Sequence, residues 1–324
     1  MCSQRVFGAR QLGSRQPSLV AIGNFDGVHR GHQAVLAQAL RLAQPDGLTP
    51  LVLTFDPHPA VVLGRPALPA LTSLERKLEL MCRQSPELRV VVEPFTSELA
   101  NTEPADFAKR LLVDALSAKL VLVGENFRFG RGRAGDFALL ERLGVEHGFV
   151  AHATALERDA SGPISSTRVR AALSQGDLGA VEALLGRPHA LTGVVEPGQG
   201  RGKSIGVPTA NLGGFFEALP PHGVYAVLVD HRQNGAFVAL GAGVANFGVR
   251  PTLGAGPSFE AHVFDKTLDL YGQELRVHLL GRLREERKFS GVDELRAQIA
   301  RDIQAARSLT APRKPDPSAL GAWY

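Results

Sequence analysis

Cysteine and long apolar runs are scarce in this chain of 324 residues, and each shortage excludes a class of protein. The two cysteines, Cys2 and Cys82, lie far apart and form no C-x-x-C pair. We therefore expect neither a disulfide framework nor a cysteine zinc site, and a reducing cytoplasm is the simplest setting. No run of about 18 apolar residues occurs, and the first residues lead into no apolar signal segment. We expect no membrane span and no secretion signal.

The chain also has little excess charge. Its 36 Lys and Arg residues nearly balance 32 Asp and Glu residues, which gives a net charge of +4. No long basic run is interleaved with aromatic residues, so nucleic acid is not an expected partner. Apolar residues make up 44%, a value typical of globular proteins, and the length allows two domains.

Residues 21–32 (AIGNFDGVHRGH) are the most informative segment. A strand over 18–22 runs into a glycine turn, where Gly23 lets a phosphate approach the backbone, and a helix follows. His29 and His32 then lie beside the unpaired amides and the positive dipole end of that helix. The pattern predicts a nucleotide-phosphate site, although two histidines at this spacing also suit a metal or ordinary capping. The loop matches neither the dinucleotide fingerprint nor the P-loop.

Short apolar runs alternate with helical stretches throughout the first half. We expect strands near 18–23, 50–55, 88–93, 119–123 and 148–154, and helices near 31–44, 73–84, 103–117 and 135–146. This alternation predicts an α/β domain with a doubly wound parallel sheet. Ligands bind such sheets at the carboxyl ends of the strands, and the polar motifs of this half follow predicted strand ends.

The pattern changes near residue 186. Short strands at 223–229, 236–246, 259–264 and 275–283, followed by a helix at 291–306, predict a small antiparallel β-barrel with a closing helix. We therefore divide the chain into domains at 1–185 and 186–306, with a loose tail at 307–324.

A glycine-rich loop precedes the predicted barrel strands. It spans residues 198–206, contains Gly202 and Lys203, and runs directly into VPTANL at 207–212. Glycines permit close approach of phosphates, and Thr209 and Asn211 offer neutral oxygens of the kind that Mg²⁺ accepts. The alternative is simple turn chemistry after a proline.

The motifs of the first half carry a family resemblance. Residues 21–32 resemble the H-x-G-H signature of the nucleotidyltransferase superfamily, in the version found in prokaryotic bifunctional riboflavin kinase/FAD synthetases. TFDPHP at 54–59, GENFRFG at 124–130 and SSTRVR at 165–170 follow in the order of that family. In the second half, residues 206–212 resemble the G-x-P-T-A-N-L signature of riboflavin kinases. The resemblance covers about residues 16 to 306.

The resemblance implies two ATP-dependent reactions. Riboflavin is phosphorylated to FMN in the C-terminal barrel, and in the N-terminal domain a phosphate oxygen of FMN attacks ATP, so that AMP is transferred and pyrophosphate leaves. The implied partners are riboflavin, FMN, FAD, ATP, ADP and pyrophosphate, with Mg²⁺ as the metal cofactor and the cytoplasm as location. No nucleic acid or membrane is implied, and a weak homo-oligomer is left open.

The resemblance also assigns residue roles in the N-terminal domain. His29 and His32 would hold the triphosphate as candidate catalytic residues, and three residues at a helix start would clamp its β- and γ-phosphates. These three are Ser166, Thr167 and Arg170. The other residues expected near nucleotide or flavin are Gly23, Asn24, Pro57, His58, Asn126 and Arg128. Competing interpretations are a helix cap for the serine-threonine run, a solvated basic loop around residue 128, and a plain strand end at 57–58.

In the barrel, the resemblance makes Glu260 the base that takes the proton of the ribityl hydroxyl. Gly202 and Lys203 would bind nucleotide, and Thr209 and Asn211 would hold the metal. On its own, a residue such as Glu260 is more often just an exposed strand carboxylate, and the glycine-rich loop favours the functional interpretation. Lys203 stands where the family commonly has Arg, and it gives up the bidentate fork, so we expect weaker nucleotide binding or a different loop pose in the kinase half.

Two alternative functions remain. One is an adenylyltransferase whose barrel only holds flavin, and the other is a flavin-sensing regulator that binds RNA or protein. The presence of Glu260, Thr209 and Asn211 speaks against the first. The lack of an aromatic and basic stripe speaks against the second.

Overall fold

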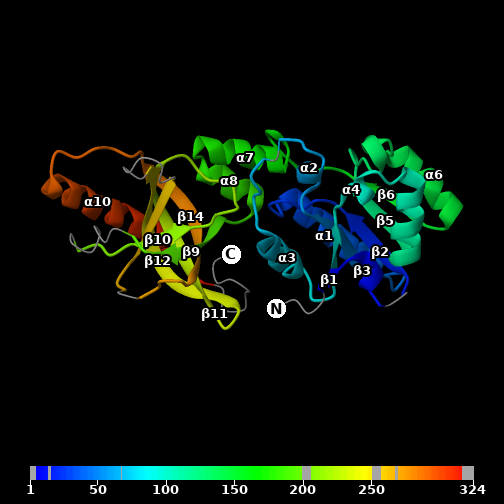
Figure 1. Cartoon of the computed structure of the whole chain (residues 1–324), viewed down its shortest axis with the longest axis horizontal. Coiled ribbons are helices and arrows are strands. Elements are labelled where there is room, and N and C mark those ends of the chain that lie inside the picture. The colour runs from blue at the N-terminus through cyan, green and yellow to red at the C-terminus, as the bar shows by residue number, and fades with distance from the viewer. Residues whose placement is uncertain are drawn as a thin grey trace. The chain divides into compact units, whose positions relative to one another are not determined.

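The computed structural model describes residues 5–13, 16–66, 68–198, 206–249, 257–266 and 269–315. These residues form two compact units, one made of residues up to 68 together with 74–165, and the other of 69–73 together with the chain from 166 onward. Figure 1 shows the helices and strands of both units. The expectations for Gly202 and Lys203 fall outside the described residues.

The first unit is built on a parallel sheet of six strands, which confirms the predicted α/β architecture. The strand order is β1-β4-β3-β2-β5-β6. Their bounds are β1 Arg5–Phe7, β2 Ser18–Ile22, β3 Thr49–Asp56, β4 Arg89–Pro94, β5 Ala118–Gly124 and β6 Val150–Thr154. All five residues of β2 are buried, because a central parallel strand is covered on both faces of the sheet.

Helices cover both faces of this sheet (Figure 1). On one face, β-strand residues such as Leu53 and Val121 pack against Phe107, Leu112 and Leu140. The opposite face packs against α1 and α3. The helices are α1 Arg30–Ala43, α2 Pro59–Val62, α3 Leu74–Cys82, α4 Ser97–Ala100, α5 Pro104–Phe107, the π-type helix η2 Ala108–Ala115 and α6 Phe137–His147, with short 3-10 turns η1 Ala9–Gln11 and η3 Arg131–Arg133. A two-stranded hairpin, β7 Arg158–Asp159 and β8 Gly162–Pro163, follows β6.

One cysteine differs from the sequence-based expectation. Cys82, the last residue of α3, is disulfide-bonded. The wide spacing of the two cysteines in the sequence led us to expect no disulfide. This expectation was wrong, because sequence spacing does not determine which side chains the fold brings together.

The second unit begins with two helices and continues into a closed barrel. Its strands pair antiparallel in the order β10-β13-β12-β11-β14-β9, which confirms the predicted barrel. The elements are α7 Ser166–Gln175, α8 Leu178–Leu185, β9 His189–Glu196, β10 Ala210–Gly213, β11 Gly223–Gln233, β12 Ala236–Val249, β13 Pro257–Val263, β14 Glu274–Arg284 and α10 Val292–Thr310. Helix α10 therefore extends beyond the predicted end at residue 306.

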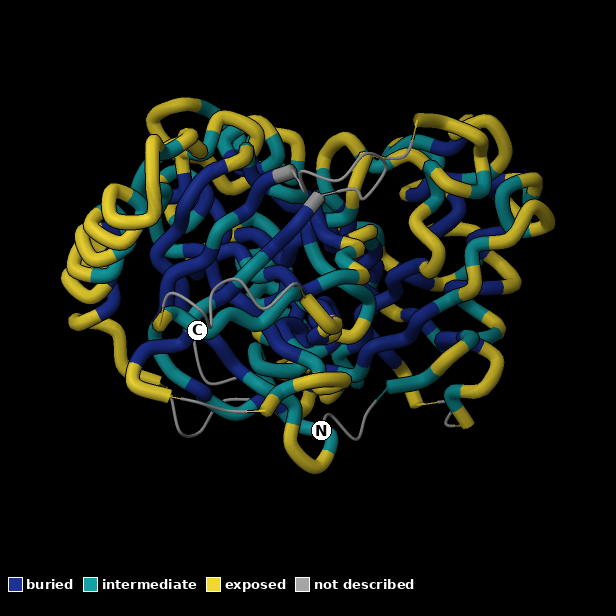
Figure 2. Tube along the Cα trace, turned by 60° about the vertical axis from the view of Figure 1, so that its left-hand side comes forward, coloured by how far each residue is buried: buried dark blue, intermediate teal, exposed yellow. Residues whose placement is uncertain are grey.

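Alternation along the strands separates the inside of the barrel from its outside. Phe247 and Phe259 are cross-strand partners with buried rings 6.0 Å apart, and they belong to the inner face. On the outer face, Val224 and Val244 pack against Ala306 of α10. Figure 2 shows the strands largely buried and the exposed residues concentrated in loops and on helix surfaces. Helix α10 thus covers part of the outer wall, where a pocket between helix and strands can form.

Within the parts of the chain that the structure describes, no helix has both the length and the apolarity that crossing a bilayer requires.

Candidate active sites

The first candidate site begins where β2 passes into α1. His29 is the N-cap of α1, and its Nδ1 accepts a hydrogen bond from the backbone N–H of His32 at 3.3 Å. The two imidazole rings stack with centroids 3.6 Å apart. Gly31 fits between the His29 ring and the backbone of Ile164, because a Cβ there would lie 3.2 Å from the His29 ring and 3.3 Å from the carbonyl oxygen of Ile164. Nδ1 of His29 therefore serves as a helix cap, as one of the alternative interpretations expected. The stacked rings of His29 and His32 lie at the start of α1.

The loop before α1 has an unusual backbone. Phe25 and Val28 have φ values of 51° and 39°, a left-handed region that residues other than glycine rarely adopt. Both side chains are buried in the core that also contains Leu36 and Val52. Packing therefore holds this loop in a conformation that its own backbone does not favour.

A cavity of about 370 Å³ lies beside this loop. Five of the predicted site residues line it: Gly23, Asn24, His58, Asn126 and Arg128. They come from the segments that follow β2, β3 and β5, so the carboxyl ends of three strands converge as expected. His29, His32 and Pro57 are not among the described residues that line this cavity.

Aromatic rings form much of the cavity wall. Phe127 and Phe129 stack with centroids 5.5 Å apart, Phe107 lies 5.5 Å from Phe129, and Phe55 meets Phe95 edge-on at 5.7 Å. Flat ligands are favoured between such rings. These phenylalanines were not predicted as site residues. Two of them stand in the GENFRFG motif, and their place in that motif could have indicated that they line the site.

The predicted clamp residues Ser166, Thr167 and Arg170 occupy the first turns of α7. They belong to the second compact unit, not to the unit that contains His29 and His32. The guanidinium Nε of Arg170 donates to the carbonyl oxygen of Pro69 at 3.0 Å. Their contact with a triphosphate stays a prediction.

The second candidate site is a polar row across the outer face of the barrel. Asn211 of β10 lies opposite Glu196 of β9 on one side and Glu260 of β13 on the other, and Glu260 in turn lies opposite Asn246 of β12. Residues in one such row point to the same side of a sheet, with adjacent side chains within contact range. The register thus brings together residues that are far apart in the sequence.

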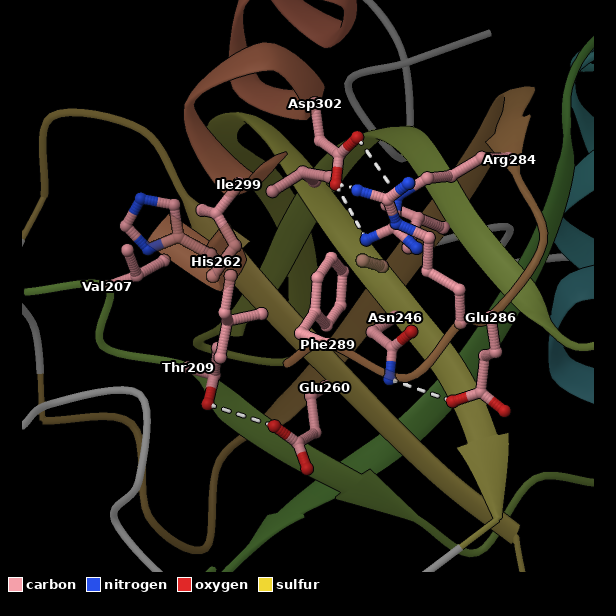
Figure 3. Close-up of a pocket in the computed structure, with 15 residues that line it drawn as sticks. Val207, Thr209, Asn246, Glu260, His262, Arg284, Glu286, Phe289, Ile299 and Asp302 are labelled. Carbon is pink, nitrogen blue, oxygen red and sulfur yellow. Dashed lines mark hydrogen bonds and ion pairs between the residues drawn. The ribbon is translucent and has the colours of Figure 1, made fainter. Parts of the chain in front are cut away.

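Figure 3 shows the cavity of about 280 Å³ above this row, with Glu260 and Thr209 facing each other on its wall. The Thr209 hydroxyl donates to Glu260 Oε2 at 3.4 Å, and the Ser258 hydroxyl donates to Glu260 Oε1 at 3.2 Å. His262 Nδ1 lies 2.8 Å from the carbonyl oxygen of Pro208, which ties the segment before Thr209 to β13. The half-buried carboxylate is therefore oriented by a hydroxyl on each oxygen.

Helix α10 and the end of β14 close the other side of this cavity. Asp302 is buried, and the Arg284 guanidinium donates to its two oxygens at 2.8 to 3.1 Å. Phe289 lies under two guanidinium groups, 5.6 Å from that of Arg284 and 4.8 Å from that of Arg287. Figure 3 shows the Asp302 and Arg284 pair and the Phe289 ring bordering the same space as Glu260.

Comparison with known proteins decides the family. The family model for FAD synthetase matches residues 12–168, and the family model for riboflavin kinase matches residues 185–310. The bifunctional riboflavin kinase/FMN adenylyltransferase of Escherichia coli strain K12 is 40% identical over 303 residues, which cover 92% of this chain and 94% of that protein. The chain belongs to the bifunctional riboflavin kinase/FMN adenylyltransferase family.

Other relatives agree with this assignment. Proteins of the same name from Pseudomonas fluorescens and Bacillus subtilis strain 168 are 38% and 36% identical, over 95% and 89% of this chain and 98% and 91% of theirs. A crystal structure titled as a macrolide-efflux protein from Streptococcus pneumoniae shares the fold, with a TM-score of 0.82 and 28% identity, covering 94% of this chain and 99% of that chain. The N-terminal part is thus an FAD synthetase domain, and the C-terminal part is a riboflavin kinase domain.

The riboflavin kinase domain contains oxygen donors that fit Mg²⁺. Thr209 lines the cavity, and Asn211 follows it on β10 with its side chain packed against Gly198, where a Cβ would lie 2.0 Å from Asn211 Nδ2. No cluster of three His, Cys, Asp or Glu side chains that could hold a metal occurs in the described ranges. A hydroxyl, an amide oxygen and one carboxylate suit a small hard cation that keeps waters and takes phosphate oxygens.

Proposed function

We propose that this chain phosphorylates riboflavin with ATP in its barrel unit and transfers AMP from ATP to FMN in its parallel-sheet unit. The observation that carries the proposal is the Glu260 carboxylate, placed on a cavity wall between two hydroxyl donors and next to Thr209 and Asn211. The other walls of this cavity come from β11, β12, the end of β14 and α10, so the carboxylate faces a space that a ligand can enter.

The kinase step needs a base, a phosphate site and a flavin site. Glu260 takes the proton of the ribityl hydroxyl, whose oxygen attacks the γ-phosphorus of ATP, and ADP leaves. The hydroxyls of Ser258 and Thr209 hold the carboxylate in place for this transfer. The apolar part of the cavity, which includes Phe289 and Ile299, takes the flavin.

Mg²⁺ would be held by Thr209 and Asn211, and when bound it would offset the negative charge of the ATP phosphates. Gly202 and Lys203 stay assigned to the nucleotide on the strength of the sequence resemblance alone. A lysine there contributes a point charge without the planar fork of arginine.

Adenylyl transfer proceeds in the other unit by direct displacement. A phosphate oxygen of FMN attacks the α-phosphorus of ATP, and pyrophosphate leaves. His29 and His32 at the start of α1 would stabilise the negative charge that develops, helped by the helix dipole. The aromatic walls of the 370 Å³ cavity would take the flavin ring, with Asn126 and Arg128 beside it. Ser166, Thr167 and Arg170 are proposed to hold the departing phosphates.

The remaining partner assignments complete the proposal. We place the enzyme in the cytoplasm, with riboflavin, FMN, FAD, ATP, ADP and pyrophosphate as ligands and Mg²⁺ as cofactor. The low net charge supports an absence of nucleic-acid binding.

The test is incubation of the purified chain with riboflavin, ATP and Mg²⁺, followed by separation of the flavins. We expect FMN and then FAD. The His32→Ala variant should accumulate FMN without making FAD, because His32 lies in the parallel-sheet unit and the Glu260 cavity lies in the barrel unit. FAD formation only from supplied FMN would show an adenylyltransferase with a non-catalytic barrel, and no turnover of either substrate would favour a flavin-binding regulator.

A further inference from the structure

Lys77 of α3 is a buried cation in the adenylyltransferase unit. Its side chain is one of the least exposed charged groups there, with 8% of the residue accessible, and lysines are rarely buried without partners. The Nζ donates to the carbonyl oxygen of Asn24 at 3.3 Å, to the Thr54 hydroxyl at 3.2 Å and to the carbonyl oxygen of Phe55 at 3.4 Å. An ammonium has three N–H donors, so these three oxygens satisfy it.

The three acceptors lie on two different segments of the site. Asn24 follows β2, whereas Thr54 and Phe55 lie near the end of β3. The Thr54 hydroxyl in turn donates to the carbonyl oxygen of Asn24 at 3.2 Å, which closes a triangle of hydrogen bonds. Asn24 and Phe55 also line the 370 Å³ cavity. Lys77 therefore joins two segments that line this cavity.

The segment after Asn24 is the strained loop described above. Phe25 and Val28 keep positive φ values there, and such conformations persist only where surrounding contacts determine them. The Lys77 hydrogen bond holds the residue immediately before Phe25. His29 caps α1 one residue after Val28, so the position of Asn24 and the position of the histidine pair depend on the same short loop.

We propose that Lys77 is a positioning residue for adenylyl transfer, whose ammonium joins the ends of β2 and β3 and so sets the loop that carries Asn24, His29 and His32. This inference rests on the adenylyltransferase function proposed above. Lys77 acts through the backbone oxygens and the hydroxyl that it holds.

The charge of Lys77 makes this role dependent on pH. Burial lowers the pKa of Lys77 from its ordinary value of 10.5, and Asp26 and Asp56, the charged groups that face it, oppose this shift. A neutral amine keeps two N–H donors, so one of the three hydrogen bonds is lost on deprotonation. FAD formation should therefore decline at alkaline pH, before an exposed lysine titrates, while an arginine at this position stays protonated.

The experiment uses the full chain with Lys77→Met, Lys77→Arg and the control variant Leu143→Ala. Leu143 is buried in α6 of the same unit, whereas the three oxygens that accept from Lys77 belong to residues outside α6, so this variant reports the effect of lost stability. FAD formation from FMN and ATP is measured over a pH range, FMN formation from riboflavin is measured in the same preparations, and thermal melts confirm folding.

We expect Lys77→Met to lower kcat for FAD formation on the order of 10²-fold, as small displacements of a reacting site do, with FMN formation unchanged. Lys77→Arg should recover most of the rate and move the alkaline decline to higher pH. A wild-type kcat in Lys77→Met, or a loss no larger than that of Leu143→Ala, overturns the proposal. If Lys77→Met does not fold, an alkaline decline that is identical in wild type and Lys77→Arg overturns it. Absence of FAD formation by the wild type would instead refute the underlying function.

Discussion

Replacing Glu260 by glutamine is the sharpest test of the kinase chemistry. Glutamine keeps the length of the side chain and one carbonyl oxygen, so it can still orient a ribityl hydroxyl, but it cannot take a proton. In the structure one carboxylate oxygen accepts from Ser258 and the other from Thr209. One of these hydroxyls would therefore face an amide N–H₂ group after the substitution, and it can rotate toward another acceptor.

The expected sizes of the two effects differ enough to separate them. A positioned general base contributes on the order of 10²- to 10⁴-fold in rate. At about 1.36 kcal/mol for each factor of ten, this is about 2.7 to 5.4 kcal/mol of barrier. The lost hydroxyl-to-carboxylate hydrogen bond bears on folding stability and is bounded by about 1.5 to 3 kcal/mol. Glu260→Gln should therefore lose most of its FMN formation while it stays folded.

The assay measures FMN production at saturating riboflavin and ATP, with thermal melts beside it. Glu274→Gln is the matched control, because Glu274 is also a strand carboxylate of the barrel, is held by Arg232 and does not line the cavity. Adenylylation of supplied FMN should stay near the wild-type rate in both variants. A fall of less than about tenfold in FMN formation by Glu260→Gln would refute the role of Glu260 as base.

Three further predictions concern the metal, the α1 loop and a buried acid. Thr209→Ala and Asn211→Ala should each raise the Mg²⁺ concentration needed for half-maximal FMN formation, and unchanged Mg²⁺ titrations would contradict the assignment. Gly31→Ala should lower FAD formation and spare FMN formation, because its Cβ would lie 3.2 Å from the His29 ring; equal loss of both activities would argue against a local effect. Burial raises the pKa of the Glu217 carboxyl from its ordinary value of 4.5, so the stability present below that pH is lost as pH rises. The melting temperature of Glu217→Gln relative to wild type should therefore increase as the pH rises above about 4.5, and a pH-independent difference would contradict it.

Local sequence signals predicted most of the first unit. The strand at 18–23 and the helix after it were recoverable because the glycine turn and the capping histidine lie within a few positions of each other. Strand β1 was missed because three residues, RVF, are too short for a pattern of alternation. The predicted helix at 103–117 contains a π-type stretch at Ala108–Ala115. This stretch was not predicted, because the hydrophobic pattern of a helix does not show which carbonyl each N–H binds.

The sequence motifs identified most of the candidate site residues, but they did not show which of these residues lie opposite or next to one another in the fold. Asn211 and Glu260 were both expected, yet their opposition across β10 and β13 depends on a strand, β10, that is only four residues long and was not predicted. The ring cluster around Phe129 depends on packing between segments that sequence periodicity treats separately. Lys77 carried no signal of its own, because a lysine in a helix normally indicates a solvent-facing position.

Riboflavin phosphorylation depends on the pairing register between β10 and β13, because this register places Glu260 opposite Asn211. A slip of one residue would exchange the two faces of β13, so that the carboxylate of Glu260 would enter the apolar interior and the ring of Phe259 would point outward. The misfolded barrel would thus lose its base and gain a buried charge in a single step. In refolding experiments, recovery of FMN formation should therefore follow recovery of native strand pairing, not recovery of total strand content.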